Sequence, residues 1–297
     1  MLSYRHSYHA GNFADVLKHI VVVDILQSLT KKDKPFDYVD THAGAGMYQL
    51  DSGHASKLAE YKQGVAKLNP EAWPEISGYS DAVAAVNGGV FTPEAFSSGT
   101  TPLGAATSGK PLRYPGSPTI AAQFLRPKDR AWLYELHPKD SELLRKQMGK
   151  QRNVRVFQED GLRGMLSLLP PVSRRALVLI DPSYEVKTEY EHVFTTISSA
   201  HKKFATGIYA LWYPVVDRAK INTLEKRFVR SGIRDIQRFE FGLSPDSHER
   251  GMTASGMIVV NPPWGLRDRM SHILPKLVSR LGEPNKAHYR CDTLVDE

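Results

Sequence analysis

The sequence predicts an α/β fold: a doubly wound, mostly parallel seven-stranded Rossmann-like sheet covered by helices, with a small helical insertion. Short apolar runs recur along the chain, and helical segments separate most of them, as expected for buried parallel strands joined by crossover helices. A glycine-rich turn directly follows the first run, as in nucleotide-binding sheets. The runs are residues 36–40, 131–135, 154–157, 176–180, 208–212, 236–241 and 257–260.

The helical segments follow the same logic. Residues 13–29 carry apolar side chains at helical spacing and end at Lys31-Lys-Asp-Lys34, which predicts the first helix. Residues 58–90 are typical of one or two helices, and the Gly-, Ser- and Thr-rich residues 96–109 of a loop. We expect residues 1–52 and 111–297 to form the main domain and residues 53–110 an inserted helical subdomain with a flexible loop. Crossover helices are predicted at residues 139–148 and 221–231.

Composition narrows the function classes. The 297-residue chain has a formal net charge of +7 and a pI near 9.3, so it should be attracted to polyanions such as nucleic acid. Its polar start has no apolar signal core, and no run approaches the ~18 apolar residues of a membrane span. Cys291 is the only cysteine, which excludes an intramolecular disulfide and a multi-cysteine metal cluster. We expect a cytoplasmic protein.

Three features at strand ends predict a nucleotide-type cofactor site. Asp40-Thr-His-Ala-Gly-Ala-Gly46 follows the first strand, and its glycines let the backbone turn tightly and approach a ligand. Glu135 closes the second strand, where a carboxylate can accept hydrogen bonds from ribose hydroxyls. Asp160, followed by Gly161, lies just past the third strand, where it can bind an adenine amino group. Together they predict binding of an adenosyl group.

The fourth strand, residues 176–180, runs into Asp181-Pro-Ser-Tyr184. This turn resembles the Asp/Asn-Pro-Pro-Tyr turn of amino-methyltransferases, although Ser183 replaces the usual second proline. Adenine N6 is a poor nucleophile because its lone pair is delocalised into the ring. Hydrogen bonds to the Asp181 carboxylate and the Pro182 carbonyl would localise that lone pair and aim it, so catalysis would rest on positioning and electrostatics. Tyr184 would stack on a base removed from its helix.

A second turn, Asn261-Pro-Pro-Trp264, matches the Asn-Pro-Pro-aromatic pattern more closely. It follows the last of the runs given above, which in a sheet of the methyltransferase type is antiparallel and ends at the edge opposite the cofactor. We therefore interpret it as a structural turn. Methylation of cytosine at carbon five needs a cysteine nucleophile, and the turn after residues 176–180 has none. An amino nitrogen as the methyl acceptor is favoured.

With these residues in hand, the chain resembles the bacterial 23S ribosomal RNA adenine-N6 methyltransferase J family over nearly its whole length. The matching stretches are Met1-Leu-Ser-Tyr-Arg-His6, His9-Ala-Gly-Asn12, Ala14-Asp-Val-Leu-Lys-His19, Asp40-Thr-His-Ala-Gly-Ala-Gly46, Tyr114-Pro-Gly-Ser-Pro118, Glu135-Leu-His-Pro138, Ala210-Leu-Trp-Tyr-Pro-Val215 and Gly251-Met-Thr-Ala-Ser-Gly256.

The resemblance implies transfer of a methyl group from S-adenosyl-L-methionine to adenine N6 in 23S ribosomal RNA, either as naked RNA or in an early assembly particle. It implies that Asp181 is the catalytic residue and that Tyr4 contacts the RNA. It also implies a small helical subdomain between the first two strands, and we expect a monomer. The implied cofactor contacts are His19, His42, Ser117, Glu135, Asp160 and Gly161.

Several alternatives stay open. The motifs do not separate RNA from DNA adenine as the substrate. A nicotinamide-dependent oxidoreductase could use the same sheet, but Asp181-Pro-Ser-Tyr184 has no evident role in one, and a catalytically silent nucleic-acid binder would not need the cofactor acids. Basic groups flanking residues 176–180 could meet phosphates, whereas a solvated helix face is the favoured interpretation of those at residues 226–234.

Overall fold

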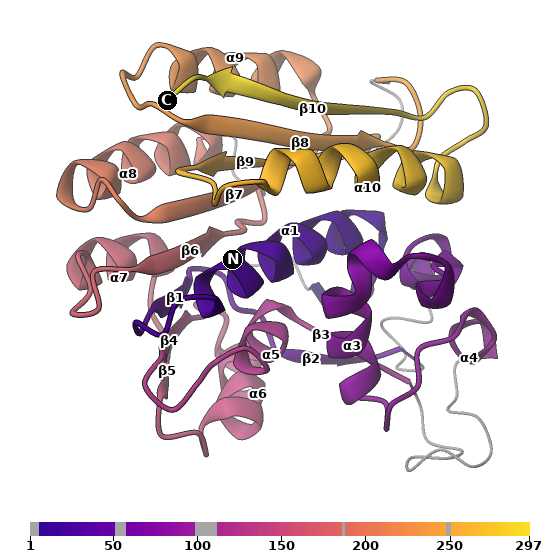
Figure 1. Cartoon of the computed structure of the whole chain (residues 1–297), viewed down its shortest axis with the longest axis horizontal. Helices are drawn as coiled ribbons and strands as arrows, with labels where there is room; N and C mark the ends of the chain where they lie inside the picture. The colour runs from indigo at the N-terminus through magenta and orange to yellow at the C-terminus, as the bar shows by residue number, and fades with distance from the viewer. Residues whose placement is uncertain (1–5, 51–57, 99–111, 186–187, 248–250) are drawn as a thin grey trace.

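The computed structural model describes residues 6–50, 58–98, 112–185, 188–247 and 251–297. Its centre is one eight-stranded sheet (Figure 1). The strands are β1 (Asp37–Asp40), β4 (Arg130–Tyr134), β5 (Val154–Phe157), β6 (Ala176–Ile180), β7 (Ile208–Val215), β8 (Ile236–Gly242), β9 (Ala254–Val260) and β10 (His288–Val295). The prediction of seven strands was wrong by one: β10 pairs with β8 at the sheet edge.

The strand order is β10-β8-β9-β7-β6-β1-β4-β5, and the five strands from β7 to β5 are parallel. From β1 the chain moves outward through β4 to β5, then returns to β6 on the other side of β1. This reversal between β1 and β6 leaves a crevice at the carboxyl ends of the strands, where sheets of this kind bind ligands. β9 inserts antiparallel between β7 and β8.

Helices cover both faces of the sheet (Figure 1). Along β6, Leu177 and Leu179 point into an apolar cluster that also contains residues of α1, α5 and α10, while Val178 and Ile180 point into a second one with α7, α8 and α9. The helices are α1 (Phe13–Thr30), α3 (Ser77–Ala85), α4 (Pro93–Ser98), α5 (Ser117–Ala122), α6 (Pro138–Met148), α7 (Gly161–Leu168), α8 (Glu189–Lys203), α9 (Arg218–Val229) and α10 (Leu266–Leu281).

Helix α1 is buried on nearly every side, because it packs between the sheet, α5, α10 and the segment that precedes β4. Its first turn is closed by the N-cap Asn12, whose side-chain oxygen accepts hydrogen bonds from the backbone N–H groups of Ala14 and Asp15. Three polar residues, Asp15, Lys18 and His19, are buried in this otherwise apolar helix. Buried polar groups need partners, so these residues mark a site.

The segment between β1 and β4 adds a small antiparallel sheet of two strands, β2 (Met47–Gln49) and β3 (Arg113–Pro115), and packs α3 against α1. Residues 60–76 form 3-10 turns rather than the predicted α-helix, and Pro70 and Pro74, which lack a backbone N–H, begin the last two turns. These turns are η2 (Glu60–Gln63), η3 (Val65–Lys67), η4 (Pro70–Ala72) and η5 (Pro74–Ile76), and η1 (His6–Tyr8) precedes α1. Residues 96–98 end α4; the rest of the predicted loop, residues 99–109, lies outside the described residues. That residues 53–110 form a separate subdomain stays a prediction.

Candidate active site

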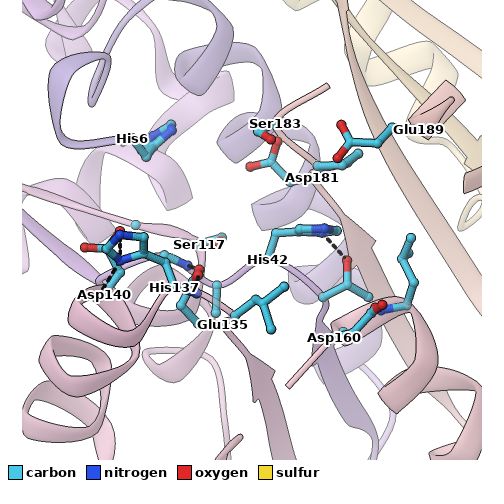
Figure 2. A pocket seen from close by; sticks show the side chains of 18 of the residues that line it. His6, His42, Ser117, Glu135, His137, Asp140, Asp160, Asp181, Ser183 and Glu189 are labelled. Carbon is cyan, nitrogen blue, oxygen red and sulfur yellow. Dashed lines mark hydrogen bonds and ion pairs between the residues drawn. The ribbon is translucent and has the colours of Figure 1, made fainter. Parts of the chain in front are cut away.

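A pocket opens at the carboxyl ends of β1, β4, β5 and β6 (Figure 2). Each strand is followed by a residue that lines it: His42 after β1, Glu135 after β4, Asp160 after β5 and Asp181 after β6. Because these strands are parallel, their carboxyl ends lie at the same edge of the sheet. The four residues, each of which follows one of these strands, are therefore close together in the fold.

Asp40, the last residue of β1, organises the floor of the pocket. Its side chain is fully buried and accepts hydrogen bonds from the Tyr38 hydroxyl at 2.7 Å and the Ser117 hydroxyl at 2.6 Å. The His42 backbone N–H donates to its other oxygen at 3.2 Å. Burial raises the pKa of Asp40 to about 6. Ser117, at the start of α5, is thereby fixed against β1, 77 residues earlier in the chain.

Glu135 joins the turn after β4 to the glycine turn after β1. One carboxylate oxygen accepts the Gly44 backbone N–H at 2.8 Å, and the other accepts the His137 N–H at 2.7 Å. Gly44 has φ of +59°, a left-handed conformation that glycine adopts without strain. Burial raises the pKa of Glu135 to about 7. The carboxylate keeps lone pairs that face the pocket, which is the arrangement needed to accept ribose hydroxyls.

Asp160 caps helix α7, accepting hydrogen bonds from the backbone N–H groups of Leu162 at 2.9 Å and Arg163 at 3.2 Å. Gly161 packs so tightly on the turn after β1 that a Cβ atom there would lie 2.0 Å from the Thr41 carbonyl oxygen. His42 lies between these two turns, and burial lowers its pKa to about 4, so it is neutral at pH 7.

His19 supplies an observation that points to a ligand. Its Nδ1 is 2.8 Å from the Tyr114 hydroxyl, while its Nε2 is buried and has no hydrogen-bond partner among the residues that the structure describes. Burial lowers the pKa of His19 to about 3, so the ring is a neutral donor or acceptor. Because His19 belongs to the pocket lining, its unsatisfied nitrogen points to a polar small-molecule ligand such as S-adenosylmethionine.

Asp181 is tied to helix α1. Its carboxylate accepts a 2.6 Å hydrogen bond from the Lys18 ammonium group, which also lies 2.9 Å from Asp15. Asp15 in turn is 2.8 Å from the His6 ring and accepts the Gly11 backbone N–H at 2.9 Å. Burial raises the pKa of Asp181, against the opposing effect of Lys18. The two carboxylates raise the pKa of Lys18 above its usual value despite its burial, so the ammonium stays charged.

A second pocket adjoins the first at Asp181. It has an aromatic wall in which the Tyr184 ring lies 4.3 Å from the Tyr190 ring and 6.0 Å from the Trp212 ring, centre to centre. The Tyr184 hydroxyl donates to the Trp212 carbonyl at 2.7 Å, which fixes the ring in place. Lys18, His6 and Ser183 line both pockets, as does Asp181.

The competing turn after β9 lies at the other edge of the sheet. The Asn261 side-chain amide donates to the carbonyls of Ala205 and Gly207, which precede β7, both at 2.7 Å. Trp264 is 93% exposed to solvent. This confirms the structural interpretation of Asn261-Pro-Pro-Trp264: the asparagine holds a loop together and lines neither of the two pockets described above.

The structure brings nearly all of the predicted site residues together. Around the first pocket lie His19, His42, Ser117, Glu135, Asp160, Gly161, Asp181 and Pro182, with Tyr184 in the adjoining one. Tyr4 lies outside the described residues. Sequence reasoning missed Lys18, Asp15, Asp40 as an anchor for Ser117, and Trp212. The signal for the first two was present: charged residues inside an otherwise apolar helix.

Comparisons with known proteins agree with this geometry. The family model described as "Ribosomal RNA large subunit methyltransferase D, RlmJ" matches residues 33–295. A relative from Escherichia coli (strain K12), named "Ribosomal RNA large subunit methyltransferase J", is 47% identical and covers 100% of both chains. One of the same name from Haemophilus influenzae is 46% identical over 95% of this chain and 94% of its own.

A solved structure shows the same fold. The crystal structure of a Legionella pneumophila protein superposes with a TM-score of 0.83 at 34% identity, covering 96% of this chain and 98% of the other. The match to the family model extends over most of the chain, and the similarity to the Escherichia coli relative over all of it. This chain therefore belongs to the RlmJ family of ribosomal RNA large subunit methyltransferases.

Proposed function

We propose that this protein transfers a methyl group from S-adenosylmethionine to the N6 atom of an adenosine in 23S ribosomal RNA. The observation that carries the proposal is the position of Asp181 between two pockets, one lined by the acids suited to an adenosyl group and the other walled by aromatic rings. An acceptor base in the aromatic pocket and a methyl donor in the acidic pocket would meet at this carboxylate.

The first pocket offers a specific role for each cofactor residue. Glu135 would accept the ribose hydroxyls, and Asp160 would accept the adenine amino group. Ser117, held by Asp40, and the free Nε2 of His19 would bind the polar amino-acid end. S-adenosylmethionine supplies an electrophilic sulfonium methyl group. The residues bind and orient it, and His42 closes the base of the pocket as a neutral side chain.

Asp181 would act on the acceptor. An ionised carboxylate that accepts a hydrogen bond from the N6 amino group raises the electron density on nitrogen and holds its lone pair toward the donor. The Lys18 ammonium group opposes the effect of burial on the pKa of Asp181 and so favours the ionised carboxylate. The carboxylate can then hold the proton that the amino group loses. Tyr184, Tyr190 and Trp212 offer faces on which a base removed from its stack can pack.

The test is methyl transfer from radiolabelled S-adenosylmethionine to unmodified 23S ribosomal RNA, followed by nuclease digestion to identify the nucleoside. We expect N6-methyladenosine from the wild type and a loss of at least about 100-fold in turnover from Asp181→Ala, the size typical of removing one key hydrogen-bonding group. Trp264→Ala, in the competing turn, is the matched control and should keep full activity. Binding of S-adenosylhomocysteine by Asp181→Ala would show that the variant is folded.

Parallel reactions address the open alternatives. Duplex DNA in place of RNA tests the DNA adenine reading, and label in DNA alone would overturn the proposal. Naked RNA compared with an early assembly particle identifies the physiological substrate. We further infer that the enzyme acts as a monomer, which its mass in solution would test. Unchanged turnover in Asp181→Ala would move the active site elsewhere.

A further inference from the structure

Helices α8 and α9 pack against each other on one face of the sheet (Figure 1). A groove lined by residues of both helices runs between them. We call it the α8–α9 groove. Its inner part is lined by Tyr190 and Lys220, and its outer part by Lys202, Lys226 and Arg230. The proposed chemistry uses none of the three outer residues.

The groove is continuous with the aromatic pocket. Tyr190 and Lys220 line both the pocket at Asp181 and the inner groove, and Arg227 lines both its inner and outer parts. From Lys220 to Arg230, α9 advances roughly 15 Å at 1.5 Å per residue. That length corresponds to about four phosphates along one strand of a duplex. A strand whose target base entered the aromatic pocket could therefore continue along the groove.

The charge of the groove is strongly positive and largely uncompensated. Arg227 pairs with Glu191 at 2.5 Å. Across the ranges that the structure describes, Lys202, Lys220, Lys226 and Arg230 form no ion pair. Lys202, Lys226 and Arg230 are exposed. Unpaired cations on two adjacent helices repel one another, and a polyanion bound between them relieves that repulsion.

The floor of the groove combines rings and a free hydroxyl with these cations. The Lys220 ammonium lies 5.8 Å from the Tyr190 ring centre, and the Arg227 guanidinium lies 6.0 Å from that of Phe194. The buried Ser198 hydroxyl has no hydrogen-bond partner among the described residues and lines the outer groove. Aromatic faces, cations and hydroxyl donors together are the groups that bind a sugar–phosphate backbone.

We propose that the α8–α9 groove binds the RNA backbone flanking the target adenosine, with Lys202, Lys226 and Arg230 contacting phosphates. The inference rests on the proposed function for the identity of the polyanion. It assigns the basic residues near 226–230 to substrate binding rather than to a solvated helix face. The groove positions the strand; selection of the base belongs to the aromatic pocket.

The test compares two triple variants that each remove three positive charges. The groove variant is Lys202→Gln/Lys226→Gln/Arg230→Gln. The control is Lys31→Gln/Lys32→Gln/Lys34→Gln, three exposed basic residues between α1 and β1, at the sheet edge opposite the site. Since both variants have the same net charge, a difference between them reports a local contact and not the overall attraction of a basic protein for RNA.

For the groove variant we expect KM for a 23S ribosomal RNA fragment to rise on the order of tenfold at ~0.1 M salt, with kcat within about twofold of the wild type. The slope of log KM against log salt concentration should become shallower by about two to three, one for each lost phosphate contact. The control variant should match the wild type in both quantities. Wild-type KM and salt slope in the groove variant would overturn the inference.

Direct binding of the same fluorescently labelled fragment, measured by anisotropy, separates this inference from the proposed function. If the wild type transferred no methyl group to RNA, the proposed function would fail, while binding would still reveal whether the groove variant alone loses affinity. If the wild type, the groove variant and the control variant bound the fragment with equal affinity, the groove would not bind this RNA, and the proposal would be contradicted.

Discussion

Replacing Lys18 by methionine tests the buried charge network around Asp181. The Lys18 ammonium is the cation between Asp15 and Asp181, at 2.9 and 2.6 Å, and the side chains of Lys18 and Asp15 are almost completely buried. Methionine keeps the volume of the aliphatic stem and removes the charge. Asp181 then loses the ammonium that opposes the effect of burial on its pKa, so we expect that pKa to rise further.

The magnitude follows from the cost of breaking a buried ion pair, about 3–5 kcal/mol, because the remaining charge is left uncompensated. For a chain of this size each kcal/mol lowers Tm by roughly 2–4 °C, so we expect a decrease of about 6–20 °C at pH 8. The deficit relative to the wild type should shrink as the pH falls toward 5. A raised pKa in the folded state means that the folded variant takes up a proton before the unfolded chain does, which favours folding at lower pH.

The assay is thermal unfolding of the wild type and Lys18→Met from pH 5 to pH 8. Lys146→Met is the matched control, since Lys146 pairs with Glu142 on the exposed surface of α6, and its Tm should not change. The double variant Lys18→Met/Asp15→Asn should recover part of the loss by removing one of the two stranded carboxylates. A Tm within 2 °C of the wild type, or a deficit independent of pH, would refute the reasoning.

Two further predictions concern the cofactor pocket. Because the pKa of Glu135 is about 7 and ribose hydroxyls favour its ionised form, Kd for S-adenosylhomocysteine should rise by up to about tenfold per pH unit below pH 7 and stay flat above it. In Glu135→Gln, Kd measured by calorimetry should depend on pH only below pH 6, where Asp40 becomes protonated. A pH profile of Kd identical to that of the wild type would contradict the role of Glu135. Gly161→Ala should lower the free energy of unfolding by about 1–3 kcal/mol and weaken cofactor binding, because its Cβ would overlap the Thr41 carbonyl. Gly251→Ala, where no described residue would lie within 4 Å of the added Cβ atom, should match the wild type in Tm and Kd, and equal values for both variants would exclude the steric argument.

Much of the sheet could be predicted from the sequence, since buried parallel strands are continuous apolar runs. The structure confirms the runs at β5 and β6 at the same residues. Strand β10 was missed for the opposite reason. It is an edge strand, and most of its residues are half-buried. Because its polar and apolar residues alternate only weakly, the sequence contains no apolar run at this position. The three-residue strands β2 and β3 are too short to carry a pattern.

The site divides in the same way. Glu135, Asp160 and Asp181 could be predicted because each follows a parallel strand, and topology alone brings strand ends together. Lys18 reaches Asp181 across 163 positions of sequence, and Ser117 reaches Asp40 across 77. Such contacts depend on how α1 and α5 dock on the sheet, which local patterns do not encode. The family resemblance named Ser117, but its partner needed the structure.

The all-round burial of α1 also has a consequence for synthesis of the chain. This helix is made early, yet it packs against β9 and α10, which begin at residues 254 and 266. At about 5–20 residues per second, ribosomes need roughly 10–45 s to reach them. Throughout that interval the newborn helix lacks the cover that these elements provide. If translation stopped before β9, the apolar surface of α1 would stay exposed to chaperones and to other nascent chains.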